Sequence, residues 1–273
     1  DFPLGNGGGI YITNASGYAY ESSLTITGNT RITGNTASGS GEYSGLGGGL
    51  CVGFMPNEDA EGYVPSVYLQ EGSIEGNSAE NGGDVYVCTA LTFKEKGYGG
   101  YAYTVGTGSG SPAVNVSDGF VIGESVPYDL SSFGENTGSD EKTDGQSEDA
   151  AGTDIPYDEY FAYSEAAAAG IPSDAVTASN ESELEKALAD KAGCIVIAQD
   201  IALKNGLVIT SDTVIYGQEH TLSYEGADEC EGVITIEKGT AVMDGLVINA
   251  GRNARTIYVM PEAKACVRAC VLS

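Results

Sequence analysis

Short apolar segments recur along the first third of the chain, each followed by the same polar and glycine-rich sequence. Apolar residues alternate with polar ones up to Ile32, residues 34–37 read GNTA, and a glycine triplet at 47–49 leads into the apolar segment 50–52. The same order returns between residues 67 and 87, with Ile74, GNSA and two glycines in the corresponding places. Alternation with a period of two predicts short β-strands, and an internal repeat of this kind predicts a solenoid.

Two further segments belong to the same array. Residues 7–12 repeat the glycine element, and residues 114–123 read as one more rung. Each strand-like segment is too short to bury its apolar face alone, so the copies are expected to stack as parallel strands with glycines at the corners. Asn35 and Asn77 stand at equivalent corners, either as a ladder of stacked amides or as ordinary turn residues. Residues 1–134 are therefore predicted to be β-helix rungs from the middle and end of a solenoid.

Residues 174–273 begin a second array with a helix. The sequence SELE, starting at Ser182, is a capping-box pattern, and the helix that it opens has apolar positions at Leu184, Ala187 and Leu188. Strand-like segments follow, including 195–197, 207–209, 214–216 and 233–236. Because an amphipathic helix ahead of the first rung can cover the open apolar end of a solenoid, this region is predicted to be a cap and the first rungs of a β-helix.

The two ends of the chain read as one continuous passage. The last residues form a strand without a cap, and the first residues run directly into the glycine repeat. Uncapped strand edges are templates for association, and contacts that do not close into a ring give filaments. The residues expected at these assembly ends are Phe2, Leu4, Cys266, Val267, Cys270, Val271 and Leu272. The partner expected is the protein itself, head to tail or in tandem copies, and an arbitrary boundary is the open alternative.

The net charge of the chain disfavours some classes of function. The 273 residues carry 12 Lys and Arg against 39 Asp and Glu, a net charge of −27. Such a chain is poorly suited to nucleic acid or anionic lipid, and it has no apolar run of about 18 residues that would span a membrane. The balance suits an extracellular or cell-surface protein. No signal segment opens the chain, so we expect any export signal to have been removed or to lie outside these residues.

The acidic character is strongest in residues 135–173, which are predicted to be a linker or long loop. Residues 157–169 are expected to form a short helix inside it. A calcium site is the open alternative, although the acidic spacing matches no EF-hand and no acidic nonapeptide repeat. Its ligands would be Asp140, Glu141, Asp144, Glu148 and Asp149.

The chain has six cysteines and a single histidine that could bind a metal or, for the cysteines, form disulfides. The cysteine spacing contains no zinc pattern, so a zinc site is not expected. Six cysteines can pair in about 15 ways, and buried unpaired thiols in the core of a β-helix are the alternative.

The repeat built on residues 32–37 and 47–52 resembles that of the chlamydial polymorphic outer membrane proteins and of other bacterial and archaeal adhesin-like surface proteins. Residues 74–79 with 82–87, and residues 7–12, match as well, so the resemblance covers roughly the first third of the chain. It implies a right-handed parallel β-helix on a cell surface. The fold class expected for the whole chain is therefore all-β.

Residues 176–222 separately resemble the entry of pectate-lyase-like β-helices, in which a turn like 217–222 (GQEHTL) is common. His220 lies in this turn and is expected to be structural, with catalysis as the alternative. The resemblance implies that a lyase would combine acidic calcium ligands with a basic residue on neighbouring rungs. The candidates are Asp200, Asp212 and Asp244 with Arg252 or Arg255.

Tyrosine is the remaining candidate for ligand binding. The chain contains 17 tyrosines and no tryptophan, and its densest Gly/Tyr patch holds Tyr98, Tyr101 and Tyr103, which either stack on sugar rings or pack a loop. We predict an extracellular structural or adhesin-like β-helix, without enzymatic activity or a cofactor, in a head-to-tail surface fibre. The alternative is a β-helix that binds or degrades polysaccharides, with host or cell-wall glycans as its partners.

Overall fold

The computed structural model describes residues 7–13, 22–38, 45–53, 65–80, 82–87, 113–116, 120–123, 125–126, 170–251 and 254–273. Short β-strands dominate this part of the chain. The N-terminal strands are β1 (Ile10–Thr13), β2 (Ser23–Thr27), β3 (Thr30–Ile32), β4 (Leu50–Gly53), β5 (Ser66–Leu69), β6 (Gly72–Ile74), β7 (Val85–Val87), β8 (Ala113–Val116), β9 (Val121–Ile122) and β10 (Ser125–Val126).

The C-terminal region contains a helix and the remaining strands. These elements are β11 (Val176–Ala178), α3 (Glu181–Ala189), β12 (Cys194–Ile197), β13 (Ile201–Leu203), β14 (Leu207–Ile209), β15 (Thr213–Tyr216), β16 (Thr221–Tyr224), β17 (Ile234–Ile236), β18 (Gly239–Asp244), β19 (Val247–Asn249), β20 (Ile257–Val259), β21 (Ala263–Arg268) and β22 (Val271–Leu272). The strand-like segments predicted at 195–197, 207–209 and 214–216 all lie in strands, and that at 233–236 forms β17 from its second residue.

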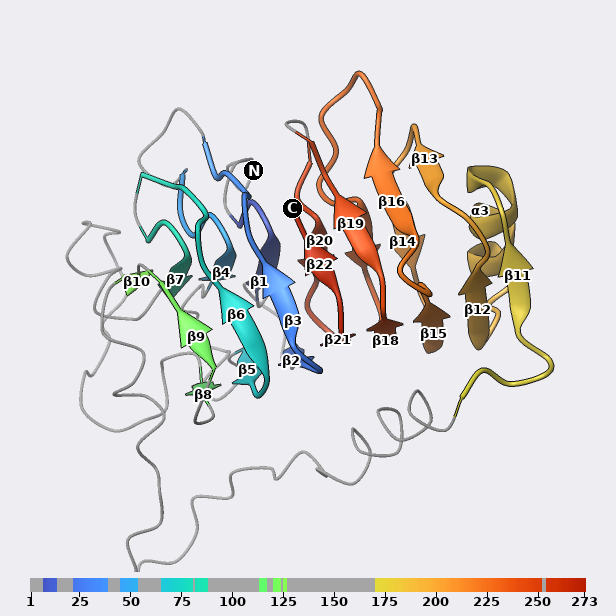
Figure 1. Cartoon of the computed structure of the whole chain (residues 1–273), viewed down its shortest axis with the longest axis horizontal. Helices are drawn as coiled ribbons and strands as arrows, with labels where there is room; N and C mark the ends of the chain where they lie inside the picture. The colour runs from blue at the N-terminus through green and yellow to red at the C-terminus, as the bar shows by residue number, and fades with distance from the viewer. Residues whose placement is uncertain are drawn as a thin grey trace, which may run out of the picture.

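The strands pair in parallel and form three sheets. Sheet A has the order β10-β7-β4-β1-β20-β17-β14, sheet B the order β11-β12-β15-β18-β21-β2-β5-β8, and sheet C the order β13-β16-β19-β22-β3-β6-β9. From β12 onward the chain visits sheets B, C and A in turn, so each circuit adds one strand to every sheet (Figure 1). This is a parallel β-solenoid, as the repeats predict.

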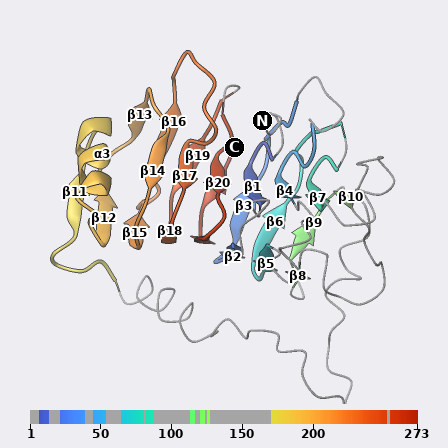
Figure 2. The same cartoon turned by 180° about the vertical axis from the view of Figure 1, so that it is seen from behind.

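The two regions of the chain stand in reverse order along the solenoid. The C-terminal strands occupy the end beside α3, and the N-terminal strands continue the same three sheets, with β20 next to β1, β21 next to β2 and β22 next to β3. Figures 1 and 2 both show the red strands beside the dark blue ones in the middle of the molecule. Residues of both predicted arrays therefore belong to one solenoid within one chain.

The interior is filled by the apolar residues at alternate strand positions. Ile26, Ile32, Ile195 and Ile257 are fully buried, and inward residues from all three sheets form a single apolar cluster. Period-two alternation places every second side chain inside, which is why short strands with Ile, Val or Leu at those positions suffice.

Helix α3 covers the end of the solenoid at β11, β13 and β14. Its apolar positions, Leu184, Ala187 and Leu188, are buried, as the sequence predicts. The capping residue is Asn180 and not Ser182: the Asn180 side chain accepts a hydrogen bond from the Glu183 amide, while Glu183 Oε2 accepts one from the Ser179 amide. The capping box therefore begins two residues earlier than expected, because asparagine serves as an N-cap as well as serine does. No described helix has the length and apolar character of a membrane span.

Candidate functional site

The junction between the two regions is the candidate site, and we call it the seam: the strand pairs β20–β1, β21–β2 and β22–β3. Inward residues meet across it in register, Ile257 opposite Ile10 and Val267 opposite Ile26. All four side chains are fully buried. Each seam pair thus supplies both the backbone ladder and the apolar contacts found between other neighbouring strands.

Buried side-chain hydrogen bonds add to these strand pairs. Thr256 Oγ1 donates to the carbonyl of Gly9. Thr30 Oγ1 lies 3.2 Å from the Val267 carbonyl and also accepts a hydrogen bond from the Cys270 amide at 3.2 Å. Polar groups in the interior must be paired to avoid the cost of desolvation, so the two sides of the seam are matched in polarity as well as in shape.

An aromatic cluster lies across the seam on the outer face of sheet A. The rings of Tyr11 and Tyr258 stack with centroids 5.4 Å apart, and the Arg255 guanidinium lies over both, at 5.0 and 5.5 Å. Arg255 also donates to the Glu231 carbonyl at 2.9 Å. Burial raises the pKa of the Tyr11 hydroxyl, so it stays protonated. Sequence analysis missed this cluster because these residues show no spacing that marks them.

Most of the residues expected at an exposed C-terminal assembly end are buried instead. Cys266, Val267, Cys270 and Leu272 are buried, since β21 and β22 have neighbours on both sides. Val271 is partly buried, and Phe2 and Leu4 lie outside the described residues. The open edge inferred from the sequence is occupied by strands β1, β2 and β3 of the same chain.

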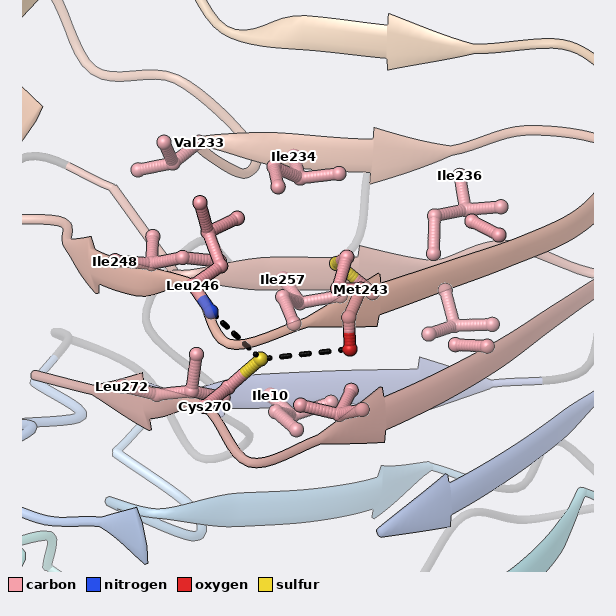
Figure 3. Packing of buried hydrophobic residues seen from close by; sticks show 14 of the residues in the cluster. Ile10, Val233, Ile234, Ile236, Met243, Leu246, Ile248, Ile257, Cys270 and Leu272 are labelled. Carbon is pink, nitrogen blue, oxygen red and sulfur yellow. Dashed lines mark hydrogen bonds between the residues drawn. The ribbon is translucent and has the colours of Figure 1, made fainter. Parts of the chain in front are cut away.

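The thiols near the seam are protected. Cys270 Sγ accepts a hydrogen bond from the Leu246 amide at 3.4 Å and lies 3.5 Å from the Met243 carbonyl (Figure 3). Desolvation raises the pKa of Cys266 and of Cys270 to about 12, so both remain thiols at neutral pH. Cys194, Cys230, Cys266 and Cys270 are free thiols, Cys51 is buried, and Cys88 lies outside the described residues.

A polar ladder runs along the corner between sheets C and A next to the seam. Asn35 Nδ2 donates to Asn77 Oδ1 at 3.0 Å, and Asn77 Nδ2 donates to Asp84 Oδ1 at 2.9 Å. At its seam end, Asn35 Nδ2 also donates to the carbonyl of Leu272 at 3.0 Å. The stacked amides expected from the repeat are therefore present. The ladder includes Asp84, which was not predicted from the sequence and which stands where the earlier copies have a glycine.

The glycines of the repeat make room for this ladder. A Cβ atom on Gly49 would overlap Ile74 Cγ2 and lie 2.7 Å from Asn77 Nδ2. A Cβ atom on Gly9 would lie 2.8 Å from Ile32 Cγ2 and 3.3 Å from Asn35 Nδ2. The isoleucine and asparagine of the repeat thus pack against the last glycine of the preceding corner, which explains why the two motifs occur together.

His220 lies in a turn, and its backbone amide donates to the Gly217 carbonyl at 2.9 Å. Gln218 and Glu219 between them have positive φ values of 50° and 66°. The half-buried imidazole lies with Nδ1 3.5 Å from Asp200 Oδ1. These contacts favour the structural role expected for His220.

The described lyase candidates do not come together. Asp200 Oδ1 accepts the Thr221 amide, and Asp212 Oδ1 accepts the Thr240 amide, both at 2.8 Å. Asp200 lies between β12 and β13 and Asp212 between β14 and β15, so they stand at different corners of the solenoid.

Asp244 belongs to the outer face of sheet B, where its Oδ2 lies 3.1 Å from Arg268 Nη1. Desolvation raises the pKa of Asp244, and the Arg268 charge opposes that shift. Arg255 is held in the tyrosine cluster on sheet A, and Arg252 lies outside the described residues. Sheet A and sheet B side chains point away from the interior in different directions, so these candidates form no common site.

The remaining candidates belong to segments outside the described ranges. The proposed calcium ligands Asp140, Glu141, Asp144, Glu148 and Asp149 and the tyrosines Tyr98, Tyr101 and Tyr103 lie outside the described residues. Within the described ranges, no cluster of three or more His, Cys, Asp or Glu side chains is arranged to hold a metal ion. Comparison with protein families, with curated proteins and with solved structures found no match to this chain.

Proposed function

We propose that this chain is an extracellular structural β-helix of the adhesin-like kind, right-handed, and that it forms part of a surface fibre. The observation that carries the proposal is the continuity of the solenoid through the seam. Three parallel sheets pass from the C-terminal strands to the N-terminal strands in register, with the apolar interior unbroken. Right-handedness is the hand expected of parallel strands connected through successive circuits.

The described polar residues support a structural role because the fold itself uses them. Among the described residues, no buried side-chain nitrogen or oxygen lacks a hydrogen-bond partner. Several carboxylates bind backbone amides of neighbouring segments: Glu181 Oε1 accepts the amides of Lys204 and Asn205, and Glu71 Oε2 accepts that of Gly28. Acidic side chains that stabilise turns in this way serve the scaffold.

The charge is consistent with an extracellular location. A net charge of −27 keeps neighbouring molecules apart in solution, and it makes a long rod of such units soluble. A fibre of these units requires specific contacts strong enough to overcome this repulsion. The seam has the apolar area and the hydrogen bonds to supply them when its two sides come from different copies.

Electron microscopy of the native material at neutral pH tests the proposal. We expect uniform elongated particles or filaments whose width equals one solenoid, and a right-handed path in a reconstructed density. Compact particles that cleave uronate polysaccharides in the presence of calcium would refute it and favour the polysaccharide-degrading alternative. A left-handed path would refute the assigned hand alone.

A further inference from the structure

The seam divides the solenoid into two bodies. The capped body comprises residues 170–273 and contains α3 and β11 to β22. The glycine body comprises the described residues between 7 and 126 and contains β1 to β10 with the polar ladder. The main contacts between the bodies are the three seam strand pairs, whereas residues 127–169 connect them in sequence.

We propose that the two bodies are exchanged between copies of this chain, so that the capped body of one copy forms the seam with the glycine body of another. This proposal rests on the structural function above and names its partner, a second copy of the same chain. Exchange of identical elements is a low-cost route to assembly because every contact of the closed monomer is made again.

The seam contacts do not depend on which chain supplies each side. The hydrogen bonds from Thr256 to Gly9, from the Cys270 amide to Thr30 and from Asn35 to Leu272 all join one body to the other. The Tyr11–Tyr258 stack does the same. An exchanged pair therefore keeps all of these interactions, and the free energy of the seam is equal in the two forms.

The connection between the bodies allows either form. It must join opposite ends of the solenoid, from β10 to β11, and the eight strands of sheet B span about 34 Å at a spacing of about 4.8 Å. A chain as long as residues 127–169 can extend to about 140 Å. The same connection can therefore reach the glycine body of its own chain or that of a neighbour.

The cap gives the exchange a direction. Because α3 covers the other end of the capped body, this body offers β20, β21 and β22 as its free edge in an open copy. The glycine body offers β1, β2 and β3 in return. Because these two edges differ, the capped body of each copy can pair with the glycine body of the next copy in an open series. Two copies can also exchange bodies with each other and form a closed dimer.

Concentration decides between the closed and exchanged forms. Because residues 127–169 join the two bodies covalently, each body meets its own partner at an effective concentration on the order of 1 mM, and separate copies compete only when they approach that value. Copies crowded on a surface or placed in tandem would meet this condition. Dilute chains are expected to be closed monomers.

A disulfide across the seam tests the exchange. Thr25 and Cys266 are register partners on neighbouring strands of sheet B. The spacing of about 4.8 Å between such strands lies within the Cα–Cα range of disulfides. The variant that combines Thr25→Cys with Cys266→Ser cannot form this bond within its own chain. Mixed with the unchanged chain, it can form the bond only through exchange, since both positions are buried in the closed seam.

The two chains are unfolded together under reducing conditions, refolded together at several concentrations, and then oxidised with diamide. Mass spectrometry identifies the peptide that links position 25 to Cys266, and non-reducing electrophoresis gives its amount. The expected result is a rise from roughly one linked chain in a hundred near 10 µM to several in ten near 1 mM. The single variant Thr25→Cys, with Cys266 retained, reports the intrachain bond.

The outcomes separate this inference from the proposed function. If the single variant forms its bond within one chain while the mixture gives no linked chains even near 1 mM, exchange is wrong and the solenoid stands. If neither sample forms the bond, the seam itself is wrong, and the structural proposal fails with it. Links in the mixture that leave position 25 unpaired, through Cys194 or Cys230 for example, also count against exchange.

Discussion

Asn77 occupies the centre of the polar ladder, and replacing it with alanine removes four hydrogen bonds. The Asn77 amide nitrogen Nδ2 donates to the Ile32 carbonyl and to Asp84 Oδ1, both at 2.9 Å. Asn77 Oδ1 accepts from the backbone amide and from Nδ2 of Asn35, both at 3.0 Å. The Asn77→Ala variant keeps the Asn77 backbone bond to Asp84 Oδ1.

The expected destabilisation follows from which partners lose their last bond. The Ile32 carbonyl still accepts the Glu75 amide, and Asn35 Nδ2 still reaches the carbonyl of Leu272. The backbone amide of Asn35, a buried residue, is left unpaired, at a cost of about 1–3 kcal/mol. With about 0.5–1.5 kcal/mol for each weakened partner, Asn77→Ala should lower the free energy of unfolding by about 3 kcal/mol.

Asn35→Ala is the matched control. It also removes several side-chain bonds, but the Leu272 carbonyl keeps the Thr33 amide and Asn77 Oδ1 keeps the Asn35 backbone amide. No buried donor is left unpaired by this change, so it should cost only about 1–2 kcal/mol. Urea unfolding followed by circular dichroism gives both values from the midpoint and slope. An Asn35→Ala variant as unstable as Asn77→Ala would refute this reasoning.

Three further predictions concern the corner, the cap and the thiols. Gly49→Ala places a Cβ atom against Ile74 and should lower the free energy of unfolding in urea by more than about 3 kcal/mol. Gly34→Ala is the control: its Cβ atom would meet no neighbour, and only the φ of 74° is unfavourable, so the loss should be about 1–2 kcal/mol. Leu184→Ala should lower the free energy of unfolding by about 2–5 kcal/mol, because this side chain of α3 is fully buried against the end of the solenoid. A loss below about 1 kcal/mol in the same measurement would contradict the role of α3 as a cap. Burial raises the pKa of Cys266 and Cys270 to about 12, against 9.0 for a free thiol, so above pH 9 the unfolded chain ionises these thiols more readily than the folded chain. Their contribution to the free energy of unfolding is therefore complete below pH 9 and is lost as the pH rises toward 12. A variant with both cysteines changed to alanine should lose less melting temperature over that range than the parent chain.

Periodic features were predictable from the sequence because a solenoid repeats its local environment. Ile32 and Ile74 hold the same inward position on neighbouring strands of sheet C, and the repeat places them there. The amide ladder was foreseen, with turn residues as the alternative, because Asn35 and Asn77 keep the same offset from those isoleucines. The buried face of α3 was also visible, since its apolar spacing has helical periodicity.

Features that depend on a single rung left no periodic pattern. Asp84 replaces the last glycine of a triplet, and nothing in the local sequence shows that its carboxylate accepts a hydrogen bond from Asn77. Tyr11 and Tyr258 are distant in sequence and meet only when the two bodies pair. The sequence likewise predicted that the ends would join but did not decide whether within one chain or between chains, since the strand edges are complementary in both cases.

The seam has a further consequence for how the chain reaches its native state. Thr256 and Gly9 are 247 residues apart, and Cys270 and Thr30 are 240 apart, whereas neighbouring strands within the capped body are joined by short connections. Contacts between distant parts of a chain require closure of a long loop and form slowly. The capped body should therefore acquire its strands first, and the seam should set the rate of the last folding step.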